Sequence, residues 1–273
     1  MQNSEQRKTW YSVDLEQRKT WYSPVADAYN KLRPRYPQEL VNRVVEIAHL
    51  PEEAAILEIG CGPGNATVSF AQLGYSMVCL EPSPEACQLA RQNCAAYPNV
   101  EFQQSTFEEW ELETGKFNAV LAATSFHWVS PDVGYAKVAN TLQDDGSLIL
   151  LWNMTLQPQY EVFQTLNEAY EIHAPSLVEY EDRETQANIL KGLGQKIIDS
   201  GKFKDLVSEY IPCEVTYSVD NYLLLLSTFS PYIGLNPQTR DALFALLREK
   251  IEQNFGGSIK VSYLSAFHVA QKF

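Results

Sequence analysis

The segment Ile56–Val68, ILEIGCGPGNATV, carries the residue types that point most clearly to ligand chemistry. Its apolar start is typical of a buried strand, and Gly60, Gly62 and Gly64 follow that strand. Glycines at a strand-to-helix turn let the backbone bend tightly and approach a ligand without a side chain in between. Pro63 lacks a backbone N–H, and Asn65 stands where a dinucleotide-binding loop has its third glycine. The loop therefore predicts a ligand-binding turn that is poorly suited to a pyrophosphate.

Two glutamates flank this loop and bear on the charge of the ligand. Glu58 precedes Gly60 by two residues, where a carboxylate would repel a pyrophosphate and favour a cationic ligand. Glu81 ends the next strand, placed to accept hydrogen bonds from ribose hydroxyls. Glu81 alone would suit NAD equally well. S-adenosyl-L-methionine has a sulfonium and an ammonium against one carboxylate, and no phosphate, so the combination predicts this cofactor and S-adenosyl-L-homocysteine as its product.

His127 and Trp128 follow the fourth expected strand, at the carboxyl edge where doubly wound sheets bind ligands. A histidine there could take a proton from a hydroxyl or amine, because its reference pKa of about 6.5 suits that role. Alternatively it shapes the pocket or binds the cofactor, and an ionised carboxylate acceptor needs no base. The sequence has no metal-ligand spacing of Cys or of His and Asp, so no metal is predicted.

The elements that must position these residues alternate between strands and helices. Strands are expected at 55–59, 77–80, 100–103, 117–122 and 147–152, with helices at 65–73, 84–94 and 133–142. Two further strands at 207–215 and 259–269 would complete the sheet edge. This alternation predicts an α/β fold with a doubly wound, mostly parallel, seven-stranded sheet and a helical cap.

Four regions are expected along the chain. Residues 1–36 form an N-terminal helical lid that contains a duplication, EQRKTWYS at Glu5–Ser12 and Glu16–Ser23, whose first copy we expect to be dispensable. Residues 37–153 form the cofactor-binding core. Residues 154–206 form a helical cap broken at Pro158, Pro175 and Gly192–Gly194, and residues 207–273 hold the last two strands with inserted helices.

Composition limits the partners and the compartment. The 273 residues include 34 Asp and Glu against 21 Lys and Arg, and this net charge of -13 argues against nucleic acid as a partner. Neither a leader peptide nor an apolar stretch long enough for a bilayer is recognisable. Five cysteines without metal spacing are typical of reduced thiols, so we expect a cytoplasmic protein, a monomer or homodimer, away from membranes.

The chain resembles the class I S-adenosylmethionine-dependent methyltransferases from about Tyr22 to Asn153 and in its last two strands. The segments EIGCGPG, VCLEPS, FNAVLAATSFHW and GSLILLWN occur in that family's order. YNKLRPRYP at Tyr29–Pro37 and SFHWV at Ser125–Val129 are most similar to the trans-aconitate and cantharidin methyltransferase branch, whose substrates are small molecules.

The resemblance implies a set of cofactor contacts. The methionine end would lie against Glu58 and the glycine loop with Cys61, the ribose against Glu81 and the adenine edge against Pro82. In the family an acidic residue often follows the third strand; here Thr106 and Phe107 take its place, with Glu108 and Glu109 as alternatives. Residues that close over the site or end the fourth strand complete the implied set: Tyr29, Arg33 and Ala123. Arg33 would bind the cofactor carboxylate, unless it is only a surface residue restrained by Pro34. The family's aspartate in the fourth strand is Asn118 here, for which we expect a packing role.

The predicted function is methyl transfer by in-line displacement to a small-molecule acceptor, such as a carboxylic acid. The cap would hold the acceptor, with Tyr160, Tyr170, His173 and Tyr180 as candidate contacts. An NAD-dependent oxidoreductase is the alternative enzyme, which Glu58 and Pro63 disfavour. A non-catalytic, regulatory protein that binds S-adenosylmethionine is the alternative of another class.

Overall fold

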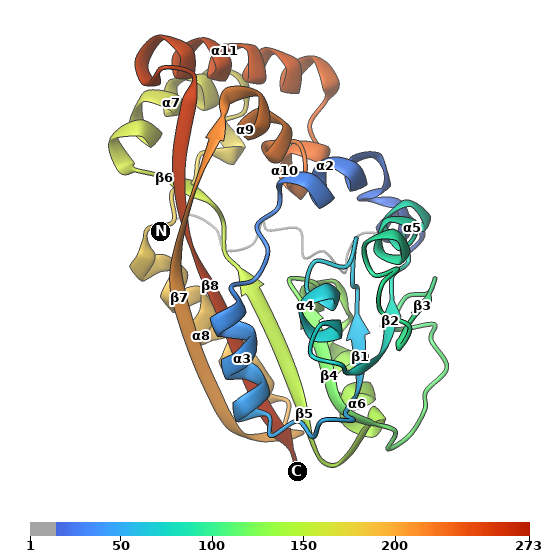
Figure 1. The fold of residues 1–273 in the computed structure, drawn as a ribbon. Helices are drawn as coiled ribbons and strands as arrows, with labels where there is room; N and C mark the ends of the chain where they lie inside the picture. The colour runs from blue at the N-terminus through green and yellow to red at the C-terminus, as the bar shows by residue number, and fades with distance from the viewer. Residues whose placement is uncertain (1–14) are drawn as a thin grey trace.

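The computed structural model describes residues 15–273, which fold around one mixed sheet (Figure 1). The sheet order is β3-β2-β1-β4-β5-β8-β6, and β7 pairs with the other edge of β8. The strands are β1 (Ala55–Ile59), β2 (Ser76–Leu80), β3 (Val100–Gln103), β4 (Phe117–Ala123), β5 (Leu142–Asn153), β6 (Gln157–Pro158), β7 (Phe203–Ser218) and β8 (Ser258–Lys272). The predicted α/β fold with a doubly wound sheet is confirmed, and the two-residue β6 adds one short strand to the expected seven.

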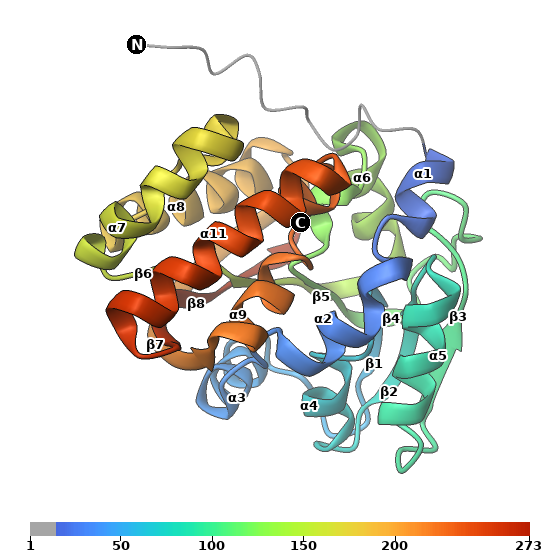
Figure 2. The same ribbon diagram turned by 90° about the horizontal axis from the view of Figure 1, so that it is seen from above.

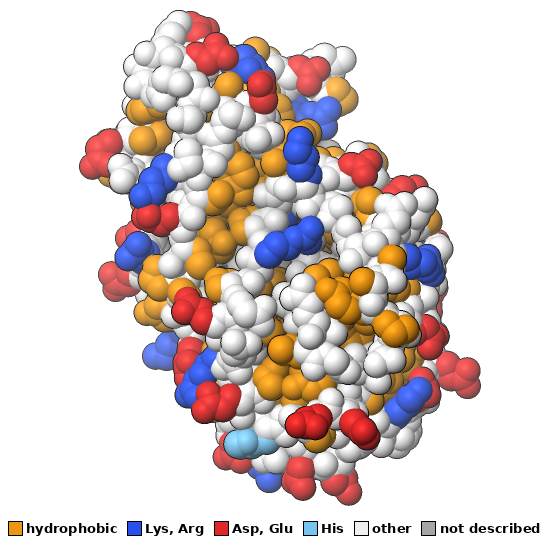
Figure 3. Space-filling model, in the orientation of Figure 1, with side chains coloured by type: hydrophobic (Ala, Val, Ile, Leu, Met, Phe, Trp, Pro, Cys, Tyr) orange, Lys and Arg blue, Asp and Glu red, His pale blue; other side chains and the backbone are white. Residues whose placement is uncertain are grey.

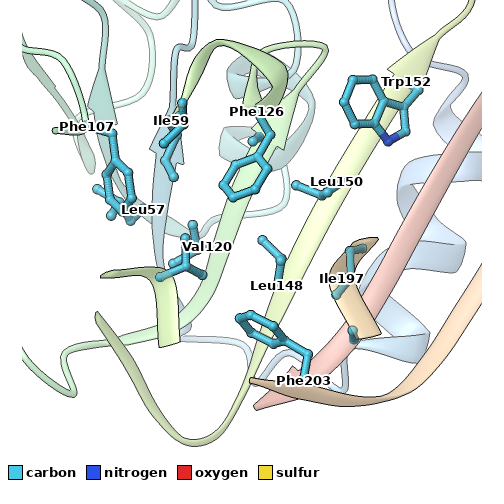
Figure 4. Close-up of a cluster of buried hydrophobic side chains, with 14 of the residues drawn as sticks. Leu57, Ile59, Phe107, Val120, Phe126, Leu148, Leu150, Trp152, Ile197 and Phe203 are labelled. Carbon is cyan, nitrogen blue, oxygen red and sulfur yellow. The ribbon is translucent and has the colours of Figure 1, made fainter. Parts of the chain in front are cut away.

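Strands β1 to β5 run parallel, and helices cover both of their faces. One face packs against α3 (Gln38–Ile47), α4 (Thr67–Ala71) and α5 (Pro84–Asn93). The other packs against α6 (Pro131–Thr141) and α8 (Arg183–Asp199). Figure 4 shows this second layer, in which Leu148 of β5 and Ile197 of α8 are among the buried side chains. Burial of this kind fixes the strand ends, where a ligand site of a doubly wound sheet is expected.

The cap lies over one end of the two long antiparallel strands, where Ser218 at the end of β7 pairs with Ser258 at the start of β8 (Figure 2). It is built from α7 (Tyr160–His173), α9 (Val219–Leu226) and α11 (Pro237–Phe255), whose buried side chains share one hydrophobic cluster. The short elements are α1 (Leu15–Thr20), α2 (Ala26–Leu32), α10 (Ser230–Ile233) and the 3-10 turns η2 (Ser23–Val25), η3 (Phe126–Trp128) and η4 (Pro175–Leu177). The first EQRKTWYS copy lies outside the described residues, so the expectation about it stays a prediction.

The predicted helix break at Gly192–Gly194 is wrong. Helix α8 runs through these glycines without interruption. A Cβ on Gly194 would lie 3.2 Å from the ring of His268 on β8, so glycine here allows close contact between helix and sheet. Leu190 and Ile197 of α8 belong to the main sheet core. Helix α8 is therefore a sheet helix and not part of the cap.

The connection left between the helix expected at 133–142 and the strand expected at 147–152 is not a loop in the structure. Strand β5 already begins at Leu142, and its pairing with β4 shifts register between Phe117 and Ala119. Asp145 has a φ of 64°, which Asp tolerates better than most residues. A bulge within one continuous strand thus replaces the expected loop.

On the face drawn in Figure 3, acidic and basic side chains are mixed with hydrophobic patches, and no broad basic area is visible there. Among residues 15–273, no helix combines the length and apolar character needed to cross a bilayer.

Candidate cofactor and acceptor pocket

A cavity of about 400 Å³ opens at the carboxyl ends of β1, β2, β4 and β5. We call it the central pocket. Its volume lies within the range of about 300–1,000 Å³ that is usual for small-molecule and cofactor sites. The pocket brings together twelve of the fourteen predicted site residues: Tyr29, Arg33, Gly60, Cys61, Gly62, Glu81, Pro82, Thr106, Phe107, Ala123, His127 and Trp128. Their roles in ligand binding stay predictions, but the sequence placed them correctly around one cavity.

Glu81, which directly follows β2, is hydrogen-bonded to the glycine loop. One carboxylate oxygen accepts a hydrogen bond from the backbone N–H of Gly62 at 2.8 Å, and the other accepts from Ser83 at 2.8 Å. A carboxylate offers about four lone-pair positions, so two remain for hydroxyl donors in the pocket. Burial raises the pKa of Glu81 to about 7. Glu81 thus holds the loop in shape and presents an acceptor to a ligand.

The prediction that Glu58 faces the ligand is wrong. Glu58 is fully buried and does not line the central pocket. Thr67 donates a hydrogen bond to its Oε2 at 2.6 Å, and Oε1 has no partner among the described residues. The physical reason is strand geometry: Glu58 pairs with Cys79 in register inside the sheet, and along this part of the chain the cavity is lined only from Ile59, the last residue of β1, onward. Burial raises the pKa of Glu58 to about 7.

Gly64 is the second predicted residue that does not reach the pocket. A Cβ at this position would lie 3.4 Å from Cys94 Sγ and 3.6 Å from the Cα of Ala90 on α5. Gly64 therefore lets α5 approach the loop closely. Asn118 has the expected packing role, because its side chain accepts from the backbone of Ala55 at 2.9 Å and donates to Gln143 at 3.0 Å.

The loop after β3 forms one end of the pocket. Thr106 donates a hydrogen bond to Glu109 at 3.0 Å, and Glu108 also lines the cavity. Phe107 is only 2% exposed and stacks on Trp110 with ring centroids 6.2 Å apart. The Phe107 ring is therefore part of the core, although the residue also lines the pocket.

The second EQRKTWYS copy belongs to the predicted lid and lies over the pocket as its roof, but its lining residues Lys19 and Tyr22 were not among the predicted site residues. Lys19 pairs with Glu109 at 2.8 Å, and Ser23 shares a hydrogen bond with Ser83 at 2.9 Å. Tyr22 bonds Ser230 at 2.6 Å and packs edge-on against the Trp128 ring at 5.7 Å. These contacts join the segment to elements far apart in sequence. The signal in the sequence was the repeat itself, but nothing in it identified these partners.

Arg33 lies at the boundary between the roof and the cap. Its Nε donates to Thr228 Oγ1 at 2.8 Å and its Nη2 donates to the Thr228 carbonyl at 2.9 Å. The guanidinium also stacks 3.6 Å from the Phe229 ring centroid and 5.0 Å from that of Tyr29. Because a guanidinium has five N–H donors, Arg33 keeps donors for an anionic group in the pocket. The alternative of an unattached surface arginine is wrong.

His127 and Trp128 form an aromatic wall after β4. The His127 ring centroid lies 5.6 Å from that of Trp128 and 5.9 Å from that of Trp152. Burial lowers the pKa of His127 to about 4, so the imidazole is neutral at neutral pH. A neutral imidazole can accept a proton or a hydrogen bond.

The acceptor contacts predicted in the cap are wrong, and others replace them. None of Tyr160, Tyr170, His173 and Tyr180 lines the central pocket, because α7 packs into the cap cluster. The polar residues found there instead are Thr124, Asn153, Thr155 and Ser230. The cap thus contributes to the pocket through the turn between α9 and α10.

Comparison with known proteins agrees with this arrangement. Residues 56–146 match a protein family described as a methyltransferase domain. An uncharacterised methyltransferase of Mycobacterium tuberculosis is 33% identical over 126 residues, covering 46% of this chain and 49% of the relative. The chain thus spans about half the length of the mycobacterial relatives that it matches.

Two further similarities extend the comparison. A probable S-adenosylmethionine-dependent methyltransferase of Saccharomyces cerevisiae is 25% identical over 147 residues, covering 52% of this chain and 50% of the relative. A solved structure of a presumed type II methyltransferase from Anaeromyxobacter dehalogenans superposes with a TM-score of 0.66 at 18% identity, covering 88% of this chain and 97% of that one. Residues 56–146 therefore resemble a methyltransferase domain, and the chain has the fold typical of class I methyltransferases.

Proposed function

We propose that this protein transfers a methyl group from S-adenosylmethionine to a small-molecule acceptor. The observation that carries the proposal is the central pocket, in which the glycine loop is braced by Glu81 within the matched methyltransferase domain. Residues of the roof and of the cap also line this pocket, and its volume of about 400 Å³ suits a small molecule.

The residues present fit the cofactor. Glu81 offers acceptor positions for ribose hydroxyls, and Arg33 offers donors for the carboxylate of the methionine end. Asn65 of the loop also lines the pocket with a buried Oδ1 that has no partner among the described residues. When bound, the cofactor supplies an electrophilic methyl group on a sulfonium. Pro63 removes a backbone N–H from the loop that would hold a pyrophosphate, which disfavours NAD.

The protein's contribution to the reaction is mainly positioning. Bringing the acceptor atom to attack distance in line with the transferred methyl group can supply on the order of 7–11 kcal/mol of the barrier. The roof formed by Lys19–Ser23 packs through Tyr22 on the aromatic wall at Trp128, which would limit the access of water to the reacting groups. His127 could take a proton only as a weak base, because burial lowers its pKa to about 4 from the value of about 6.5 that made it a candidate, and an ionised carboxylate would not require a base.

For the acceptor we propose a carboxylic acid, in line with the motifs similar to the trans-aconitate and cantharidin branch. These motifs occupy fitting positions, because Tyr29, Arg33 and Tyr36 of the first motif and His127 and Trp128 of the second all line the pocket. We further propose that the protein acts in the cytoplasm as a monomer or homodimer. All five cysteines are free, as in reducing compartments.

Radiolabel transfer tests the proposed function. The protein is incubated with tritiated S-adenosylmethionine and a panel of small carboxylic acids, amines and phenols that includes trans-aconitate. We expect label in a carboxylic acid, and we expect Glu81→Ala to lower kcat/KM for the cofactor at least tenfold, because hydrogen bonds to a charged group are worth about 1.5–3 kcal/mol each.

The matched control for this experiment is Glu101→Ala. Glu101 is exposed on β3, outside the central pocket, and should leave kcat/KM within twofold of the parent value. Binding of S-adenosylhomocysteine without methyl transfer to any acceptor class would contradict the proposed activity and favour a regulatory role. Transfer to amines or phenols alone would contradict the carboxylic acid proposal.

A further inference from the structure

Asn153 presents a buried, unused hydrogen-bond acceptor to the central pocket. It is the last residue of β5 and lines the cavity together with His127 and Trp128. Its side-chain Oδ1 is inaccessible to solvent and has no hydrogen-bond partner among the described residues. Buried polar atoms are normally paired, so an unpaired one that lines a ligand pocket indicates a partner that arrives with the ligand.

The orientation of the Asn153 amide is fixed by its surroundings. Its Nδ2 donates a hydrogen bond to the carbonyl of Pro34 at 2.9 Å. A flipped amide would set Oδ1 against that carbonyl, with two acceptors facing each other, so Oδ1 must be the free atom. The backbone is held as well, because the N–H of Asn153 donates to Thr124 Oγ1 at 3.2 Å and the strand pairs with Ser265 of β8.

Thr124, the residue that holds Asn153, is itself in an unusual conformation. It has a φ of 52°, which is uncommon for any residue but glycine and a genuine outlier for a β-branched one. The Tyr36 hydroxyl bonds Thr124 Oγ1 at 2.7 Å, and the Thr124 N–H donates to Leu151 at 2.8 Å. Strain of this kind persists where surrounding contacts over-determine it, commonly at ligand sites. The strain and the network together hold Oδ1 of Asn153 in one place.

The position in the sheet identifies which ligand supplies the missing donor. Of the residues that we assign to the cofactor, the glycine loop, Glu81 and Thr106 follow β1, β2 and β3, whereas Asn153 is the last residue of β5, beyond β4 in the sheet order. Thr155 and Leu156, which follow Asn153 closely in the chain, also line the pocket, as does the segment 229–231. This is the side of the pocket that remains for the methyl acceptor.

We propose that Asn153 binds the methyl acceptor by accepting a hydrogen bond from an O–H or N–H group of the acceptor. The proposal rests on the proposed function and narrows it, because the acceptor then carries a hydroxyl or amine in addition to its carboxylate. An acid without such a donor leaves Oδ1 buried and unpaired, and sites built around such a bond strongly reject analogues that lack it.

Matched acids test this selection. Succinate has no donor, malate adds one hydroxyl and aspartate adds one amine, and methyl transfer to each is measured by kcat/KM with tritiated S-adenosylmethionine. The same measurement is made on Asn153→Leu, which keeps the approximate side-chain volume and removes the acceptor. We expect the parent protein to prefer malate or aspartate over succinate at least tenfold, and Asn153→Leu to reduce that preference to less than threefold.

The control is Asn167→Leu on α7. Asn167 also has a side-chain oxygen without a partner among the described residues, but it lies outside the central pocket, so its variant should keep the parental preference. If Asn153 had only a structural role, Asn153→Leu would lower transfer to all three acids equally and the preference would survive, which would overturn the inference. A preference that is absent in the parent protein would overturn it as well.

Titration with S-adenosylhomocysteine shows whether the donor to Asn153 comes from the methyl acceptor or from the cofactor. It also distinguishes failure of the Asn153 proposal from failure of the proposed function. We expect Asn153→Leu to bind S-adenosylhomocysteine within twofold of the parent affinity. A tenfold loss would assign Oδ1 to the ammonium group of the cofactor and overturn the acceptor role. Failure of the parent protein to bind S-adenosylhomocysteine would instead contradict the proposed function itself.

Discussion

Gly60→Ala is expected to weaken binding of S-adenosylhomocysteine about a hundredfold or more. Gly60 has a φ of 63°, and an added Cβ would lie 2.9 Å from Ser125 Cβ and 3.3 Å from its Oγ. Ser125 cannot move freely, because its hydroxyl donates to the carbonyl of Ile59. Alanine in a left-handed conformation costs about 1–2 kcal/mol, and the clash adds to it. The loop must therefore shift where it lines the pocket.

Gly74→Ala is the matched control for this prediction. Gly74 has a φ of 91°, but nothing lies within 4 Å of an added Cβ, and Gly74 is outside the pocket. This variant should lose a similar amount of stability from backbone strain and keep its affinity for S-adenosylhomocysteine. Isothermal titration and chemical denaturation of both variants measure the two effects. Equal affinities of Gly60→Ala and the parent would show that the loop backbone does not form the cofactor site.

The stability of Glu58→Gln relative to the parent, in the absence of ligand, is expected to increase between pH 5 and pH 8. The difference between their unfolding free energies should grow by about 2–3 kcal/mol over this range. Burial raises the pKa of Glu58 from 4.5 to about 7. The unfolded chain releases this proton near pH 4.5, whereas the folded protein keeps it until about pH 7. The parent therefore loses stability as pH rises from 4.5 to 7, and glutamine, which does not titrate, avoids that loss.

Only the difference between variant and parent isolates Glu58. Burial also raises the pKa of Glu81 to about 7 and lowers that of His127 and His268 to about 4. The two histidines change the free energy of unfolding in the opposite direction. The unfolded chain takes up their protons below about pH 6.5 and the folded protein does not, so the protein loses stability as the pH falls below that value. Subtracting the two unfolding free energies at each pH removes these shared contributions. A difference that stays constant from pH 5 to pH 8 would mean that Glu58 is ionised in the folded protein throughout this range.

Local chemistry made much of the fold predictable. Strand β1 and strand β3 match the expected limits, because apolar runs of that length bounded by turn residues leave little choice. The start of α5 was predictable from its cap, since Ser83 accepts a hydrogen bond from Ala86 at 3.2 Å as expected for Ser before Pro84. The continuity of α8 was not predictable, because Gly192 and Gly194 weaken a helix locally while packing against β8 retains it.

The candidate site was predictable where it depends on strand ends and not where it depends on tertiary contacts. Gly60, Glu81 and His127 follow strands directly, so the strand pattern was enough to place them. Glu58 was misplaced because a motif does not reveal on which side of the sheet a strand residue lies relative to the loop above it. Asn153 and Tyr22 acquire their roles only through partners more than a hundred residues away, such as Pro34 and Ser230.

Isothermal titration of the intact protein with S-adenosylhomocysteine, and separately with NAD as the alternative cofactor, tests the central claim most directly. We expect one adenosyl ligand per chain with micromolar affinity, weakened at least tenfold by Glu81→Ala, and no heat of binding with NAD. Binding of NAD, or of neither ligand, to a folded protein would contradict the assignment of the central pocket to S-adenosylmethionine.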